Sequence, residues 1–226
     1  PLSIYIENLD LAFFSGRDYE DYLRRMLRYK YREHPIGVVV TIGAGALDRA
    51  LKWRSELWPG VPIVFSVVEH DRLKTLQLPA DVTGRTIRLR LSDMVAAARA
   101  VVPNLKHVAV LGEDFDPQAA TAFRGFPAEL AAVADELDVL DLTGQPLAEV
   151  LRRVADLPPD SAILYTPIYT DGTGAFFPAV EAVPRIAAAG RRPIISPIET
   201  YVGRGSIGGF VLVPSVIGEE AADQVL

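Results

Sequence analysis

The chain has 226 residues, half of them hydrophobic, and its 29 acidic and 23 basic residues leave a formal net charge of −6. This length allows one large α/β domain or two small lobes, while the negative charge and the lack of a basic stripe argue against a nucleic-acid partner. The chain contains no cysteine, which excludes disulfides, zinc–thiolate sites and thiol nucleophiles.

Hydrophobic periodicity alternates along the chain between the two-residue repeat of strands and the helical repeat of about 3.6 residues. The elements that it predicts are, in chain order, strand 2–6, helix 18–27, strand 37–42, helix 45–51, strand 62–66, helix 92–102, strands 108–111 and 138–140, helix 147–155, strand 162–165, helix 178–189, strands 193–195 and 209–213, and helix 219–226. No apolar run approaches the roughly 18–20 residues that a membrane helix needs, so we expect no membrane span.

Strand, helix and strand recur at intervals of about 25–30 residues, which is typical of right-handed βαβ crossovers on a parallel sheet. Residues 69–91 break this rhythm, because Pro79 and Gly84 interrupt any helix there. The break divides the strands into two sets. We therefore predict an α/β fold with two Rossmann-like lobes, each built on a parallel sheet.

Ligands of parallel α/β sheets bind at the carboxyl ends of the strands, where loops and helix N-termini expose backbone N–H groups. Residues that directly follow a predicted strand are therefore the candidate ligand contacts. They are Asn8, Asp10, Gly43, Ala44, Gly45, Ser66, Val67, Glu113, Asp114, Tyr169, Asp171, Glu199, Thr200 and Tyr201.

Residues 41–48 partly match the dinucleotide-binding pattern G-x-G-x-x-G between a strand and a helix. Asp48 stands where the third glycine would allow close helix–strand packing. A tight turn that exposes helix N–H groups is the favoured interpretation, with nucleotide binding and a purely structural turn as alternatives.

Two polar, glycine-rich loops follow later strands. In residues 166–174, Tyr169 could stack on a ligand while Asp171 accepts hydrogen bonds from it, or Asp171 could only satisfy backbone N–H groups of its own loop. In residues 197–209, Glu199 could pair with a ligand amine or cap a helix end. Both loops stay open between a binding role and a structural one.

Catalytic patterns are weak throughout the sequence. The chain has no G-x-S-x-G elbow, no H-E-x-x-H and no phosphate-binding loop ending in Lys-Ser/Thr. His34 and His107 precede strands, and only His70 falls near the expected site. We therefore expect a protein that is not an enzyme and that binds no metal or cofactor.

Three stretches carry a resemblance to a known family. They are Lys30-Tyr31 followed by residues 38–40 and Ala46-Leu47, the run Leu57-Trp-Pro-Gly-Val-Pro-Ile-Val-Phe65, and Leu157-Pro-Pro-Asp-Ser161 followed by Glu199-Thr-Tyr-Val-Gly-Arg-Gly-Ser-Ile-Gly-Gly209. Together they resemble the ABC-transporter substrate-binding family of type I periplasmic binding proteins. Within that family they are most similar to extracytoplasmic sensor domains of histidine kinases.

The resemblance implies a type I periplasmic binding protein architecture, with lobe one at 1–90 plus 214–226 and lobe two at 91–213. Lobe one would lack its first strand–helix unit. Because the chain starts at Pro1 without an initiator Met, we expect it to be a piece of a longer protein.

The leading hypothesis is a periplasmic or extracytoplasmic module that closes on a small molecule between its lobes. The resemblance implies an amino acid or aromatic compound as ligand, and a membrane permease or a histidine-kinase module of the same protein as partner. A Rossmann-like nucleotide-dependent enzyme and the effector domain of a transcription regulator remain the alternatives.

Overall fold

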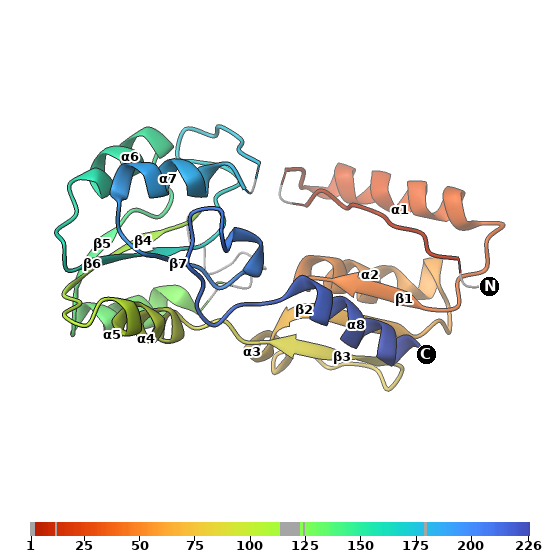
Figure 1. The fold of residues 1–226 in the computed structure, drawn as a ribbon. Coiled ribbons are helices and arrows are strands. Elements are labelled where there is room, and N and C mark those ends of the chain that lie inside the picture. Colours follow the sequence, from red (N-terminus) through yellow and green to blue (C-terminus); the bar gives the residue numbers. More distant parts are fainter. Residues whose placement is uncertain (1–2, 12, 114–122, 124, 179) are drawn as a thin grey trace. The chain divides into compact units, whose positions relative to one another are not determined.

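The computed structural model (Figure 1) describes the whole chain except residues 1–2, 12, 114–122, 124 and 179. The chain forms two compact units. Unit 1 comprises residues 1–87 and 218–226, and unit 2 comprises residues 88–217. None of the helices in the described part of the chain has the length and apolar character that crossing a bilayer requires.

Unit 1 contains a parallel sheet with the strand order β1-β2-β3. Its elements are α1 (Arg17–Tyr31), β1 (Val39–Ile42), α2 (Ala44–Leu57), β2 (Ile63–Glu69), α3 (His70–Leu73) and β3 (Val82–Ile87). Helix α2 covers β1 and β2, and α1 packs on α2. Leu47 of α2 and Phe65 of β2 belong to the core between helix and sheet, whereas Leu23 and Trp53 lie in the core between the two helices.

Unit 2 contains a parallel sheet with the order β5-β4-β6-β7. Its elements are α4 (Leu91–Val101), β4 (His107–Leu111), α5 (Phe126–Ala134), β5 (Asp138–Asp141), α6 (Leu147–Ala155), β6 (Ser161–Tyr165), α7 (Ala182–Gly190), β7 (Ile194–Ile195) and the 3-10 helix η1 (Glu199–Tyr201); helix α8 (Pro214–Val225) ends the chain. Helices α6 and α7 lie on one face of this sheet, and α4 and α5 lie on the other (Figure 1). All five residues of β6 are buried, as expected for a strand covered on both faces.

Two sets of parallel strands separated by helices confirm the predicted α/β fold with Rossmann-like sheets. The strand predictions at 37–42, 62–66, 108–111 and 162–165 are confirmed, each as a strand of one of these sheets. The helix predicted at 147–155 is found with the same bounds as α6.

Two strand predictions are wrong. Residues 3–6 form no strand, and Ile4 and Ile6 are 75% and 80% exposed. Residues 209–213 make only one isolated bridge, between Leu212 and Ile198, while the neighbouring Gly208 bridges to Ile195. An alternating or apolar pattern shows that a segment can form a strand, but a strand also needs a neighbour in register.

Strand β3 was not predicted, because Gly84 lies in its middle. A Cβ atom at Gly84 would lie 2.2 Å from the carbonyl oxygen of Phe65 and 2.5 Å from its ring. At this point the register between β2 and β3 shifts, between Phe65 and Val68, and Val67 takes a left-handed φ of 57°. Glycine therefore marks the close approach of β3 to an irregular stretch of β2, as it does at β-bulges.

Candidate ligand site

The ends of β4 and β6 in unit 2 are tied together by Thr166, the first residue after β6. Its N–H and its Oγ1 both donate to the carbonyl oxygen of Leu111, over 2.8 Å and 3.0 Å. Glu113, two residues beyond Leu111, then meets the loop that follows β6. Its Oε1 accepts hydrogen bonds from the N–H groups of Tyr169 and Thr170, over 3.1 Å and 2.9 Å.

Three tyrosines form one cluster at this end of the sheet. Tyr169 is 38% exposed, whereas Tyr201 is 2% exposed and Tyr165 is fully buried. The rings of Tyr165 and Tyr201 meet edge to face with centroids 5.2 Å apart, and the hydroxyl of Tyr201 hydrogen-bonds that of Tyr169. Tyr169 is therefore the ring that solvent or a ligand can reach, and Tyr201 supports it from inside the core.

The phenols of this cluster are held in their neutral form. Burial raises the pKa of Tyr169, and the negative charge of Glu113 raises it further. Burial is also the main cause that raises the pKa of Tyr201 and of Tyr165. At neutral pH these groups offer ring faces and neutral hydroxyls, which suits binding better than nucleophilic or base chemistry.

Asp171 is engaged within the protein. Its carboxylate accepts hydrogen bonds from the N–H groups of Leu147, Thr173 and Ala175 and from the Thr173 hydroxyl, over 2.6–3.2 Å. These hydrogen bonds hold the pKa of Asp171 at about 2, below its ordinary 3.8, against the opposing effect of partial burial. Leu147 begins α6, so Asp171 fixes the Tyr169 loop to the start of that helix.

Gly172 allows the Tyr169 loop to pack closely against the segment before α6. A Cβ atom there would lie 2.2 Å from the carbonyl oxygen of Gly144, so only glycine allows the loop to lie so close to the segment before α6.

Glu199 and Thr200, two further predicted contacts, are exposed residues of η1, directly before Tyr201. Asp114 lies outside the described residues.

In unit 1, the predicted contacts gather where β1 ends. The expectation that Ser66 and Val67 follow their strand is wrong, because β2 continues to Glu69. The N–H of Gly43 donates to the carbonyl oxygen of Ser66 over 2.8 Å, and Gly43 precedes α2 with φ 88°. Ala44 is the first residue of α2. Ser66 is buried, and Val67, the next residue, has a left-handed backbone with φ 57°. A β-branched residue rarely adopts this conformation, and such strain is concentrated at functional sites.

The segment before α1 reaches the same region. Leu11 Cδ1 lies 3.1 Å from where a Cβ atom on Gly45 would be, in the first turn of α2. Asp10, just before Leu11, has φ 46°, and its carbonyl oxygen accepts hydrogen bonds from Phe13 and Phe14. Asp10 is thus near the start of α2, although the strand expected to place it does not form, and Asn8 is exposed on the same segment.

The dinucleotide interpretation loses support at Asp48. The carboxylate of Asp48 pairs with Arg72 of α3 over 2.8 Å. A charged side chain in an ion pair therefore occupies the position where a nucleotide fold needs a third glycine for close packing.

A separate hollow of about 270 Å³ lies at the opposite, amino-terminal end of the unit 2 strands. Its lining includes His107, Asp138 and Arg153. The Nδ1 atom of His107 lies 3.2 Å from the Oδ2 atom of Asp138. No group of three or more His, Asp or Glu side chains in the described ranges is arranged to hold a metal ion. Because the hollow lies at the amino-terminal ends of the strands, it is separate from the tyrosine cluster at their carboxyl ends.

The supporting role of Tyr165 was missed from the sequence, because it ends an apolar strand and looks like core. A phenol in the last position of a strand covered on both faces is the signal that points to it, since a buried hydroxyl needs a partner. The N–H of Ile168 provides that partner over 3.4 Å.

The fold of this chain is also found in solved structures of other proteins. No family model matches the chain, and no curated protein matches it at a significant level. Solved structures do match it, and the likeness shows that the chain shares their α/β fold.

Three of these structures each match 91% of this chain. A ligand-free, open substrate-binding protein with adhesive properties from Clostridium difficile has a TM-score of 0.60 at 14% identity, with 68% of its own chain covered. The ABC domain in complex with L-Trp from Streptococcus pneumonia has a TM-score of 0.57 at 15% identity, with 70% covered. A conserved domain protein from Vibrio cholerae has a TM-score of 0.57 at 22% identity, with 68% covered.

Proposed function

We propose that the chain is an extracytoplasmic, non-enzymatic module that binds a small molecule at the carboxyl ends of its strands and closes its two lobes on it. The observation that carries the proposal is the partly exposed ring of Tyr169, backed by the buried Tyr201 and placed beside the carboxylate of Glu113. The likeness in fold to substrate-binding proteins supports it.

The chemistry of this cluster favours a ligand that carries both a cation and an apolar or aromatic group. Oε1 of Glu113 holds the Tyr169 loop, and Oε2 is the oxygen that we assign to an ammonium group of the ligand. The ring of Tyr169 would stack on an aromatic or apolar part, and cation–π attraction would add to the binding. An amino acid meets both requirements, and one structure of similar fold was solved with L-Trp.

Closure requires that the ligand bind the closed arrangement more tightly than the open one, because only differential affinity shifts such an equilibrium. Residues from unit 1 would then complete the site, with Gly43, Ala44, Ser66 and Val67 as the proposed contacts. The closed form would be delivered to a permease for uptake, or its formation would be passed to a histidine-kinase module as a signal.

A thermal-shift screen against amino acids, aromatic acids, nucleosides and sugars tests the proposal, because a ligand that binds the folded state raises the melting temperature by mass action. Tyr169→Ala should abolish the shift with a small effect on the unliganded protein. Tyr201→Phe keeps the buried ring, loses the hydroxyl that supports Tyr169 and should weaken the shift.

Tyr29→Ala is the matched control, since Tyr29 is a 71% exposed tyrosine on α1. It should leave the shift unchanged. The proposal fails if no compound stabilises the protein, or if the shift survives in both Tyr169→Ala and Glu113→Gln.

A further inference from the structure

The amino-terminal end of the unit 2 sheet carries a row of three polar side chains. They are Asp138 of β5, His107 of β4 and Ser161 of β6, which lie opposite one another in the register of neighbouring strands. Residues in register on neighbouring strands project from the same face of a sheet. Ala109 and Ile163, two residues further along β4 and β6, belong to the core that contains α6 and α7, so the row lies on the face that these helices cover.

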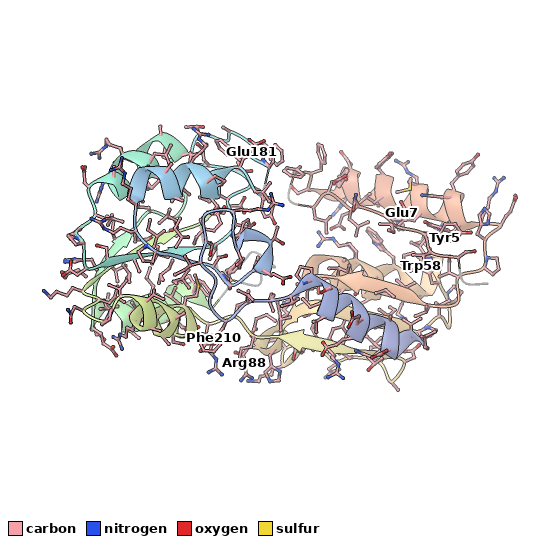
Figure 2. All side chains as sticks on the ribbon, viewed as in Figure 1. Tyr5, Glu7, Trp58, Arg88, Glu181 and Phe210 are labelled. Carbon is pink, nitrogen blue, oxygen red and sulfur yellow. The ribbon has the colours of Figure 1, made fainter. Side chains whose placement is uncertain are left out.

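The hollow of about 270 Å³ opens beside this row. Glu181, labelled in Figure 2, marks the end of unit 2 at which α7 begins, and the hollow lies at the opposite end, where the last turn of α6 finishes. Arg153, Asp156 and Leu157 line it on that side. Leu157 is 7% exposed, and with the half-buried Leu140 of β5 it gives the hollow an apolar wall.

The charges around the hollow favour a cation. The side chain of Asp138 is 81% exposed, and Asp156 is also exposed. Asp156 is the C-cap of α6, and the C-terminal end of a helix dipole is negative. Arg153 also lines the hollow, but its guanidinium lies 3.9 Å from Glu149 of its own helix. The net charge of −6 adds a long-range attraction for cations.

Ser161, the third member of the row, has unused hydrogen-bonding capacity. It is fully buried, and its Oγ has no hydrogen-bond partner among the described residues. Such a hydroxyl is unfavourable, and native proteins rarely bury one without a use for it. His107 lies one strand away, and its Nδ1 faces Asp138 over 3.2 Å. Ser161 is therefore placed to become the partner of this imidazole when another group engages Asp138.

We propose that this hollow is a second binding site, for a small organic cation that carries a primary ammonium group on a short apolar chain. The ammonium group pairs with the carboxylates of Asp138 and Asp156. The apolar chain packs against Leu140 and Leu157 and loses contact with water there. This site lies at the other end of the strands from Tyr169, so it does not depend on the function proposed above.

Butylammonium is the probe that tests this site, with butyrate and butanol as controls that share its apolar chain and differ in charge. Two-dimensional amide NMR of the 226-residue chain should show saturable changes in chemical shift at Val139, Leu140 and Leu157 with butylammonium. Butyrate should cause none, and butanol should bind more weakly than butylammonium. Changes at Tyr169 and Thr170 report the other proposed site, so one spectrum distinguishes the two.

Two single variants test the assigned carboxylates. Asp138→Asn and Asp156→Asn should each raise the Kd of butylammonium, measured at the same amides, at least about threefold. Asp156 lies outside the strands and is exposed, so its variant leaves the sheet intact. Asp141→Asn, at the other end of β5, is the matched control and should leave the Kd unchanged. The proposal is overturned by a Kd that neither variant raises, by equal changes with butyrate, or by no saturable change at the three amides.

Discussion

Replacing Asp171 with Asn tests whether its carboxylate holds the Tyr169 loop to α6. The variant keeps the shape of the side chain and removes its charge. The pKa of Asp171 lies at about 2 instead of 3.8, and at about 1.36 kcal/mol per pH unit this difference corresponds to about 2.4 kcal/mol. Solvent screening of a partly exposed carboxylate reduces this value, so we expect a loss of about 1–2 kcal/mol at neutral pH.

The pH dependence has a defined sign. The pKa of Asp171 is lower in the folded than in the unfolded chain, so its contribution is complete above about pH 5 and declines as the pH falls through 3.8 toward 2. The difference in unfolding free energy between the unaltered chain and Asp171→Asn should therefore be largest at neutral pH. It should vanish only below pH 2, once the pH has fallen through the folded pKa.

Urea unfolding at several pH values measures this difference, with Asp141→Asn as the matched control. Asp141 accepts the same local pair of hydrogen bonds, from the N–H and hydroxyl of Thr143, as Asp171 accepts from Thr173. Asp171 additionally caps the N–H of Leu147. Equal losses in the two variants, or no loss at neutral pH in Asp171→Asn, would refute the assignment.

Three further substitutions probe the packing that positions the strand ends. Gly84→Ala should lower the unfolding free energy in urea by at least about 1–3 kcal/mol, because its Cβ would overlap Phe65; an unchanged value would mean that β2 and β3 can separate freely. Val67→Gly should change stability by less than about 1 kcal/mol, since relief of the left-handed φ offsets the lost side chain, whereas the fully buried Val68→Gly should cost several times more. Gly172→Ala should displace the Tyr169 loop, because the new Cβ would overlap the carbonyl oxygen of Gly144. In the thermal-shift assay it should reduce the ligand-induced rise in melting temperature more than it lowers the melting temperature of the unliganded protein. Equal effects on the two quantities would speak against that loop as the site.

The sequence predicted the buried strands well and the exposed ones poorly. Residues 108–111 and 162–165 are central strands, and a strand covered on both faces must be apolar at every position. Residues 3–6 have an equally suitable pattern but no strand beside them. Strand β3 is at an edge and contains a glycine, so its pattern is weak although its partner exists.

For the candidate site, the sequence predicted which residues follow the strands of one sheet. Glu113, Tyr169 and Tyr201 meet at the same end of unit 2 for that reason. The sequence did not reveal that Tyr201 is buried and Tyr169 exposed, or that the hydrogen bonds of Asp171 are made within the protein. These outcomes depend on how loops from separate strands pack against one another.

The sequence by itself determined the α/β class and the two sets of parallel strands, and it predicted the end of each sheet at which we propose that a ligand binds. Hydrophobic period and strand spacing are local properties, and they are enough for those conclusions. The tertiary structure alone decided which polar side chains satisfy the protein's own backbone and which stay available. That distinction depends on contacts such as Asp171 with Leu147, between residues that only folding brings within hydrogen-bond distance.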